Sequence, residues 1–254
     1  MVRSIGVVSA KGGVGKTVVT INLSAALMHL GKNVIVVDAD IKASGLGLQL
    51  GMFHFPLTLN DVLERKTNIL EAMYIHSTGM RIIPASLCLR DTKISRLGSV
   101  LNDPRLEENI IMVDAPPGME NNAYAVLKAC KEVIFVTTPE LPSIADVMKS
   151  IAAARKSGCK VLGMVVNKYR KRGSEQIKPK EIESACGVPV IGVIPDDNLI
   201  PKGVFHGVPG LFLNPYSEVS VRFKRIAARI SGEEYRENKI LLRRLLWKLK
   251  RRRH

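Results

Sequence analysis

The feature that most restricts the fold of this chain is a glycine-rich loop near its amino terminus. The apolar run Ile5–Ser9 leads into the segment KGGVGKT, from Lys11 to Thr17, and a helical pattern over Thr17–Leu30 follows at once. Glycines let the backbone turn so that successive N–H groups point inward at an anion, and the following helix adds the positive end of its dipole. A strand, loop and helix in this order predict a phosphate-binding loop.

The rest of the chain alternates short β-branched runs with amphipathic segments. Most of the runs are almost continuously apolar, which is typical of parallel strands covered by helices on both faces. We therefore expect an α/β fold, a doubly wound, mostly parallel sheet of the P-loop NTPase kind. Ligands of such sheets bind beyond the carboxyl ends of the strands. The predicted strands are Ile5–Ser9, Asn33–Asp38, Arg81–Pro84, Ile110–Asp114, Val133–Thr137, Val161–Asn167 and Pro189–Ile194, and the predicted helices are Thr17–Leu30, Ala123–Ala129, Ser143–Lys156, Lys180–Cys186 and Tyr216–Ile230.

The chain has 254 residues, 46% of them hydrophobic, and a formal net charge of +15. This length allows one large domain with a substantial core. We expect a P-loop domain over residues 1–231, a hinge over 232–238 and a terminal helix over 239–254. Eight Lys or Arg lie between Lys239 and His254, so about half of the net charge belongs to that helix. The rest of the positive charge is distributed over the other 238 residues. This distribution argues against a domain that wraps DNA.

The cysteines and histidines predict no metal centre and no disulfide. The four cysteines form no C-x-x-C pair, and the five histidines match no metal-ligand spacing. Free thiols in a reducing cytosol are the better interpretation. No signal peptide or bilayer-spanning stretch is visible, so we expect an intracellular protein that does not cross a membrane.

The residues of the loop and of the strand ends each have a predicted role. Lys16 places a charge on the β- and γ-phosphates, and the Thr17 hydroxyl is a hard oxygen ligand for magnesium. Carboxylates after two strands, Asp38 and Asp40 after one and Asp114 after another, can hold magnesium through water or orient an attacking water. A strand-end aspartate that merely caps the next helix is the plain alternative, and it stays open for Asp38. The residues predicted to line the nucleotide in the loop are Lys11, Gly12, Gly13, Val14, Gly15, Lys16, Thr17 and Val18.

With Lys11 at its start, the loop resembles the signature K-G-G-x-x-G-K-[ST] of the MinD/ParA family of deviant Walker A ATPases. The resemblance implies binding and hydrolysis of ATP with Mg²⁺, and a Lys11 that reaches across an ATP-sandwich homodimer to the partner's nucleotide. It also implies that Asp40 positions the attacking water, with Asp40, Lys11 and Lys16 catalytic. Thr17 and Asp114 would then serve the metal, with Asp38 as a supporting carboxylate. Two departures are Ala10, where the general pattern has glycine, and Val18, where a hydroxyl residue is common.

The family also suggests contacts to the adenine base. Asn167 closes one apolar strand, and Pro195, Asp196 and Asp197 follow another. In the resembling family an amide at the first position pairs with the base edge, which suits a side chain carrying both a donor and an acceptor. An ordinary Asx turn at a strand end is the alternative.

The terminal segment from Asn238 to His254 has an amphipathic pattern. Five leucines fall within an arc of roughly 140° on a helical wheel, and Lys and Arg occupy the other side. This pattern is typical of a helix that lies at a membrane interface. A helix docked on the core and a basic arm for nucleic acid are the alternatives. The residues predicted to contact the membrane are Leu241, Leu242, Leu245, Leu246 and Leu249, with Trp247 off the leucine face.

The terminal pattern and the family resemblance together imply a MinD-like ATPase at the cytoplasmic face of the cell membrane. It would form a homodimer with ATP and attach reversibly to anionic lipid. It would also bind an activating or cargo protein and position a structure such as the division site. The rivals are a ParA-like DNA-partitioning ATPase and a flagellar or pilus placement ATPase of the same fold. An iron–sulfur carrier is disfavoured because the chain has no C-x-x-C pair.

Overall fold

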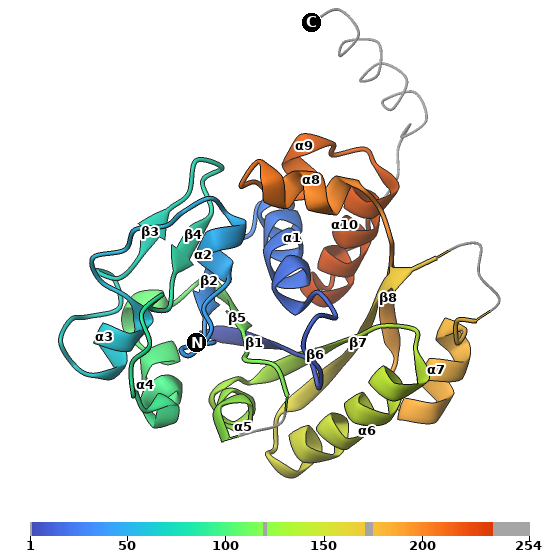
Figure 1. The fold of residues 1–254 in the computed structure, drawn as a ribbon, viewed down its shortest axis with the longest axis horizontal. Coiled ribbons are helices and arrows are strands. Elements are labelled where there is room, and N and C mark those ends of the chain that lie inside the picture. The colour runs from blue at the N-terminus through green and yellow to red at the C-terminus, as the bar shows by residue number, and fades with distance from the viewer. Residues whose placement is uncertain (1, 119–120, 171–174, 236–254) are drawn as a thin grey trace, which may run out of the picture.

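The computed structural model of this chain describes residues 2–118, 121–170 and 175–235. They form one eight-stranded sheet in the order β3-β4-β2-β5-β1-β6-β7-β8, with helices on both faces (Figure 1). All neighbouring strands are parallel except β3 and β4. The strands are β1 (Arg3–Val8), β2 (Val34–Asp38), β3 (Tyr74–Ile75), β4 (Arg81–Ile83), β5 (Ile110–Asp114), β6 (Glu132–Thr137), β7 (Lys160–Tyr169) and β8 (Val190–Pro195). The predicted fold class is confirmed for the described part of the chain.

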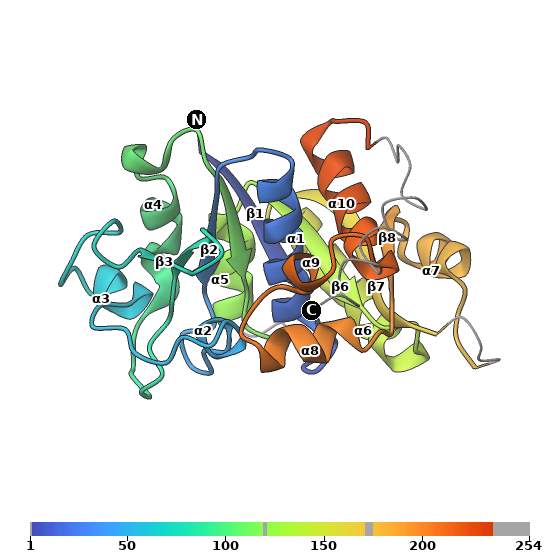
Figure 2. The same ribbon diagram turned by 90° about the horizontal axis from the view of Figure 1, so that it is seen from above.

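The helices separate into two layers. On one face, α1 and α10 pack together over the sheet, with α8 and α9 beside them, while α5, α6 and α7 lie on the other face (Figures 1 and 2). The helices are α1 (Lys16–His29), α2 (Leu46–Gln49), α3 (Leu59–Leu63), α4 (Leu97–Leu101), α5 (Asn121–Ala129), α6 (Leu141–Lys156), α7 (Pro179–Cys186), α8 (Leu199–Phe205), α9 (Gly210–Leu213) and α10 (Glu218–Ser231), with 3₁₀ turns η1 (Ile94–Arg96) and η2 (Pro104–Leu106).

The alternation of side chains along each strand explains the two layers. In β2, Val34 and Val36 belong to the core under α1 and α10, whereas Ile35 and Val37 belong to the core on the other face. Successive side chains of a strand point to opposite faces, so a run that is apolar at every position must be covered twice. For this reason the strands are apolar at nearly every position and do not alternate between apolar and polar residues.

Seven predicted strands and five predicted helices are present, with ends shifted by a few residues. The eighth strand, β3, has two residues and pairs antiparallel with β4. Sequence reasoning also missed α2, α3, α4, α8, α9 and both 3₁₀ turns, all too short to show a periodic pattern. The predicted membrane-binding residues, from Leu241 to Leu249, lie outside the described residues. Within the described ranges no helix is both long and apolar enough to cross a bilayer.

The strand order brings the predicted site together. Strand β5 lies between β1 and β2, with Asp114 level with Val7 on one side and with Asp38 on the other. The loop that follows β1 therefore begins beside both carboxylates. The parallel sheet thus places residues far apart in the sequence at one edge.

Candidate nucleotide-binding site

The loop between β1 and α1 has a backbone that favours glycine at two positions. Gly13 and Gly15 adopt φ angles of 80° and 88°, in the left-handed region. A Cβ on Gly15 would lie 2.4 Å from Nδ2 of Asn167. Gly15 then leads directly into the first turn of α1 at Lys16. Sequence reasoning placed glycines in this loop for their conformation, and the close approach of Asn167 adds a steric reason.

Two side chains from the end of β7 donate hydrogen bonds to backbone carbonyls of the loop. Asn167 donates from Nδ2 to the Val14 carbonyl at 2.8 Å, and Lys168 donates from Nζ to the Gly13 carbonyl at 2.7 Å. Lys168 itself has a φ of 56°, which is uncommon for a residue with a side chain. Because the carbonyls of Gly13 and Val14 are engaged, the loop offers its N–H groups to an anion. Sequence reasoning had no signal for Lys168.

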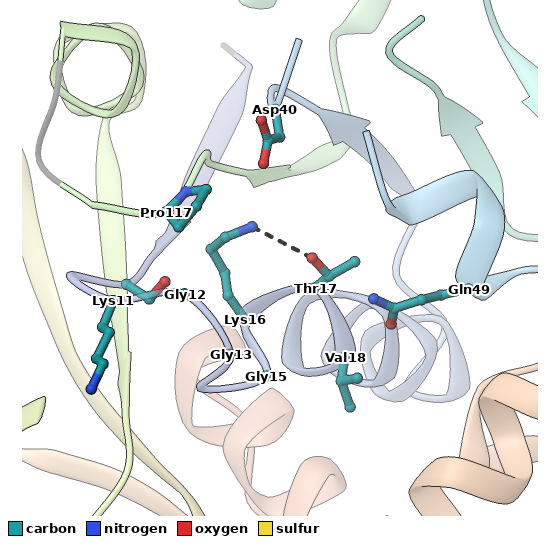
Figure 3. A pocket seen from close by; sticks show the side chains of 11 residues that line it. Lys11, Gly12, Gly13, Gly15, Lys16, Thr17, Val18, Asp40, Gln49 and Pro117 are labelled. Atoms are coloured by element: carbon teal, nitrogen blue, oxygen red, sulfur yellow. Dashed lines mark hydrogen bonds between the residues drawn. The ribbon is translucent and has the colours of Figure 1, made fainter. Parts of the chain in front are cut away.

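The loop, α1 and α2 surround a pocket of about 230 Å³ (Figure 3). Figure 3 shows Lys16 lying under Asp40 with its amine near Thr17, whereas the exposed side chain of Lys11 extends away from both Lys16 and Asp40. The size and lining suit a polyphosphate. The pocket is lined by Ser9, Lys11, Gly12, Gly13, Gly15, Lys16, Thr17, Val18, Asp40, Gln49 and Pro117.

Asp114 is the centre of the polar contacts below the pocket. Its Oδ1 is 2.8 Å from Nζ of Lys16 and accepts a hydrogen bond from the Thr20 hydroxyl at 2.8 Å. Its Oδ2 accepts from the Thr17 hydroxyl at 2.6 Å. The side chains of Lys16 and Asp114 are 7% and 2% exposed, so their charges are shielded from water and interact strongly. Thr20 was missed, although its place one helical turn after Lys16 puts it on the same helix face.

Asp38 is fully buried and shapes the turn that follows β2. Its carboxylate accepts hydrogen bonds from the Ser44 hydroxyl at 2.8 Å and from the backbone N–H of Leu46 and Asp40 at 3.2 and 3.1 Å. Burial, together with the neighbouring Asp114 carboxylate, raises the pKa of Asp38 to about 7. The contact with the Leu46 N–H, at the first residue of α2, fits the alternative of a strand-end aspartate that caps the next helix. Its part in metal binding stays a prediction.

Asp40 stands at the pocket wall opposite Lys16. Its Oδ1 accepts a hydrogen bond from the N–H of Ala43 at 3.1 Å, which orients the carboxylate. Burial raises the pKa of Asp40 above its ordinary value, although the Ala43 N–H and the Lys16 charge oppose this shift. A half-buried carboxylate that is more basic than usual can accept a hydrogen bond from water strongly.

The four residues predicted to contact adenine do not line this pocket. The amide nitrogen of Asn167 is engaged with the Val14 carbonyl. Asp196 pairs through Oδ2 with Nε of Arg170 at 3.2 Å, and Asp197 accepts from the Leu199 N–H at 2.8 Å, at the start of α8. Pro195 ends β8. Their adenine contacts stay a prediction. Gln49 and Ser9, which do line the pocket, were not predicted, and Gln49 belongs to the short helix α2.

The oxygen atoms beside Lys16 fit a magnesium ion. The Thr17 hydroxyl and the Asp114 carboxylate are hard ligands, already within 2.6 Å of each other. No group of three or more His, Cys, Asp or Glu side chains in the described residues converges as a metal centre. Magnesium at a phosphate site commonly uses one or two protein ligands, with phosphate oxygens and water completing the shell. The residues present therefore fit a magnesium ion that arrives with a nucleotide.

A parallel α/β sheet, a glycine loop leading into a helix, and a buried Lys–Asp–Thr cluster beneath that loop define a P-loop NTPase. The profile of the ParA family, described as NUBPL iron-transfer P-loop NTPases, matches residues 1–231. The chain belongs to this family.

The individual relatives agree with this assignment. An uncharacterized ATP-binding protein of Methanocaldococcus jannaschii is 36% identical over 92% of this chain and 90% of its own length. The septum site-determining protein MinD of Thermotoga maritima is 32% identical over 89% of this chain and 87% of its own. The structure of the Pyrococcus horikoshii septum site-determining protein MinD complexed with Mg-ADP superposes with a TM-score of 0.84, at 32% identity, covering 91% of this chain and 96% of that one. The protein is accordingly an ATPase that uses ATP and Mg²⁺, as the loop predicted.

Proposed function

We propose that this ATPase is a MinD-like switch that dimerises with ATP and then attaches reversibly to the cytoplasmic face of the cell membrane. There it would position a structure such as the division site. The observation that carries the proposal is Lys11, an exposed lysine at the rim of the pocket whose side chain points away from its own Lys16 and Asp40 (Figure 3). A lysine placed in this way is available to a nucleotide held by a second copy. The similarity to septum site-determining MinD proteins supports the positioning role.

The side chains at the pocket divide the chemistry of hydrolysis. Lys16 would leave Asp114 for the phosphates, and Thr17 and Asp114 would hold the magnesium ion, which neutralises phosphate charge when bound. Asp40, held by the Ala43 N–H, would accept a hydrogen bond from the attacking water and align it. Val18 lines the pocket with an apolar side chain. The backbone of the loop must therefore make the phosphate contact that a hydroxyl side chain at position 18 would make.

Dimerisation should require both ATP and Lys11. The Lys11 amine can neutralise phosphate charge across an interface only when the partner and its γ-phosphate are both present. We expect light scattering to show a dimer with ATP in a hydrolysis-deficient Asp40→Ala background and a monomer with ADP. Lys11→Ala in that background should remain a monomer with ATP.

The control for this experiment is Lys180→Ala, which removes an exposed lysine on α7. It should dimerise with ATP as the parent does. A dimer that forms equally well with ADP, or that survives Lys11→Ala, would contradict the proposed role of Lys11.

Membrane attachment should depend on nucleotide because an ATP dimer carries two terminal helices (residues 239–254, the tail of each subunit), whereas a monomer carries one. A single short amphipathic helix gives reversible attachment, with each basic residue near anionic lipid contributing about 1 kcal/mol. Two tails in one dimer make the second insertion intramolecular, so the apparent affinity can rise by about 10²–10⁴-fold. We expect liposome flotation at physiological salt to recover the protein with ATP and anionic lipid, and little of it with ADP.

The same experiment separates the membrane role from its rivals. A chain truncated after Glu237 should stay at the bottom of the gradient, and duplex DNA in place of liposomes should not co-sediment with the full chain. Attachment without the tail, or attachment that ignores nucleotide and lipid charge, would overturn the membrane proposal. ATP-dependent binding to DNA would favour the partitioning ATPase.

The family description mentions iron transfer, but the cysteines of this chain do not suit an iron–sulfur cluster. Of the four cysteines, all of which lie in described residues, Cys130, Cys159 and Cys186 are buried and Cys88 is exposed. Burial raises the pKa of Cys159 to about 11, which disfavours the thiolate that a metal requires. A cluster shared between two copies needs exposed cysteines in pairs. We therefore assign the switch role rather than iron transfer.

A further inference from the structure

A second pocket, of about 270 Å³, lies at the end of α3 and beside α4 and η2. It shares no lining residue with the nucleotide pocket. Figures 1 and 2 both place α3 and α4 at the β3–β4 end of the molecule, far from α7 at the other end. The lining consists of Val62, Arg65, Thr67, Asn68, Ile69, Arg96, Ser99, Val100, Asp103 and Arg105.

Three arginines and one aspartate give this pocket a positive balance. The aspartate, Asp103, is already engaged, since its carboxylate accepts hydrogen bonds from Nε and Nη2 of Arg105 at 2.9 and 2.6 Å. Glu71, just outside the lining, accepts a hydrogen bond from Thr67. The positive charges of Arg65 and Arg96 therefore have no carboxylate partner among the described residues.

Several donors in the pocket remain available. Arg96 uses Nη1 on the Leu63 carbonyl at 3.0 Å, which leaves its other guanidinium donors open. Arg65 makes no side-chain hydrogen bond within the described residues, and its backbone is left-handed, with a φ of 63°. Asn68 is engaged with the neighbouring segment, since its carbonyl oxygen accepts from the N–H groups of Leu70 and Glu71 and its side chain also hydrogen-bonds the Glu71 carboxylate. The planar donors of Arg65 and Arg96 match the two oxygens of a carboxylate.

Three aliphatic side chains also line the pocket. Val62, Ile69 and Val100 are buried, with exposures of 6%, 1% and 7%, so each presents only a small apolar area to it. A small apolar area beside cationic side chains suits two amino-acid side chains, one aliphatic and one acidic.

We propose that this pocket binds a short acidic segment of a partner protein, with an aliphatic side chain against Val62, Ile69 and Val100 and an adjacent carboxylate on Arg65 and Arg96. The segment bound in this pocket touches none of the residues that line the nucleotide pocket. The loop face stays open to a second copy, so the complex and an ATP dimer can coexist. This inference does not depend on the proposed membrane role.

The test uses a displayed library of short peptides with permuted acidic and aliphatic positions, selected against the full-length chain. Peptides that bind should carry Asp or Glu next to Leu, Ile or Val. In fluorescence anisotropy, Arg65→Glu should weaken such a peptide by about tenfold or more, because a charge-assisted hydrogen bond is lost and a repulsive charge is gained. Arg96→Gln, which does not add an acid, should weaken it in the same direction.

The matched control is Lys180→Glu, the same change of charge at an exposed site in the first turn of α7, where an acid is tolerated. It should leave the affinity within about twofold, since exposed charges beyond a Debye length of ~8 Å are largely screened. Thermal melting of each variant separates loss of binding from loss of folding. A selection without acidic peptides, equal binding when Glu is replaced by Gln in the peptide, or equal weakening by Lys180→Glu and Arg65→Glu would overturn the proposal.

Discussion

Asp40→Ala is expected to lower ATP turnover by about 10²–10⁴-fold, the usual contribution of a positioned proton acceptor, and to leave ATP affinity almost unchanged. The reason lies in the separation of roles at the pocket. The phosphates belong to Lys16 and the loop, whereas Asp40 faces the pocket from the turn after β2 and contacts Ala43. Removing its carboxylate should therefore leave the nucleotide bound and the water unaligned.

Two measurements decide this prediction. Single-turnover hydrolysis reports the chemical step, and titration with a fluorescent ATP analogue reports affinity. Asp91→Ala, at an exposed position outside the pocket lining, is the control and should match the parent in both. If affinity falls together with turnover for Asp40→Ala, then Asp40 holds the nucleotide and the assigned role is wrong.

Lys16→Ala should instead abolish most nucleotide binding. A charge-assisted hydrogen bond contributes about 1.5–3 kcal/mol, so losing about two of them on the phosphates lowers affinity by roughly 100-fold or more. The substitution also leaves the buried Asp114 without its cation, with the hydroxyls of Thr17 and Thr20 as remaining partners. The free energy of unfolding should therefore fall by about 1–3 kcal/mol even without nucleotide.

The other lysine of the same loop provides the control. Lys11 points away from the phosphate site of its own subunit (Figure 3), so Lys11→Ala should retain monomer affinity for ATP and thermal stability. Isothermal titration and thermal melting under conditions that keep the protein monomeric make the comparison. Equal losses in the two variants would show that both lysines serve the same subunit's nucleotide, contrary to the separate roles proposed for Lys11 and Lys16.

The sequence predicts the site best where topology alone determines position. Lys16 and Asp40 follow β1 and β2, and Asp114 ends β5. The carboxyl ends of parallel strands meet at one edge whatever the details of packing. Asp114 beneath Lys16 is an outcome that needs only the strand order. The fold class follows in the same way from apolar runs that must be covered on both faces.

Prediction was weakest where short elements decide the local contacts. Gln49 reaches the pocket because α2 forms, and four residues show no helical period. Asn167 illustrates a second difficulty, since an amide at a strand end has several suitable partners and only coordinates show that it bonds to Val14. Lys168 gave no signal, because a lysine at a strand end is ordinarily solvated.

The attachment of the loop to the end of β7 bears on how this ATPase distinguishes ATP from ADP. Contacts within the chain itself shape the loop, since Lys168 and Asn167 hold the carbonyls of Gly13 and Val14. The conformational entropy of ordering it is therefore spent during folding, and little remains to be lost when nucleotide binds. A cradle that is already rigid should accept the β-phosphate equally well from either nucleotide. Discrimination then falls to the groups that meet the γ-phosphate, and so to the turn that carries Asp40 and to a neighbouring subunit.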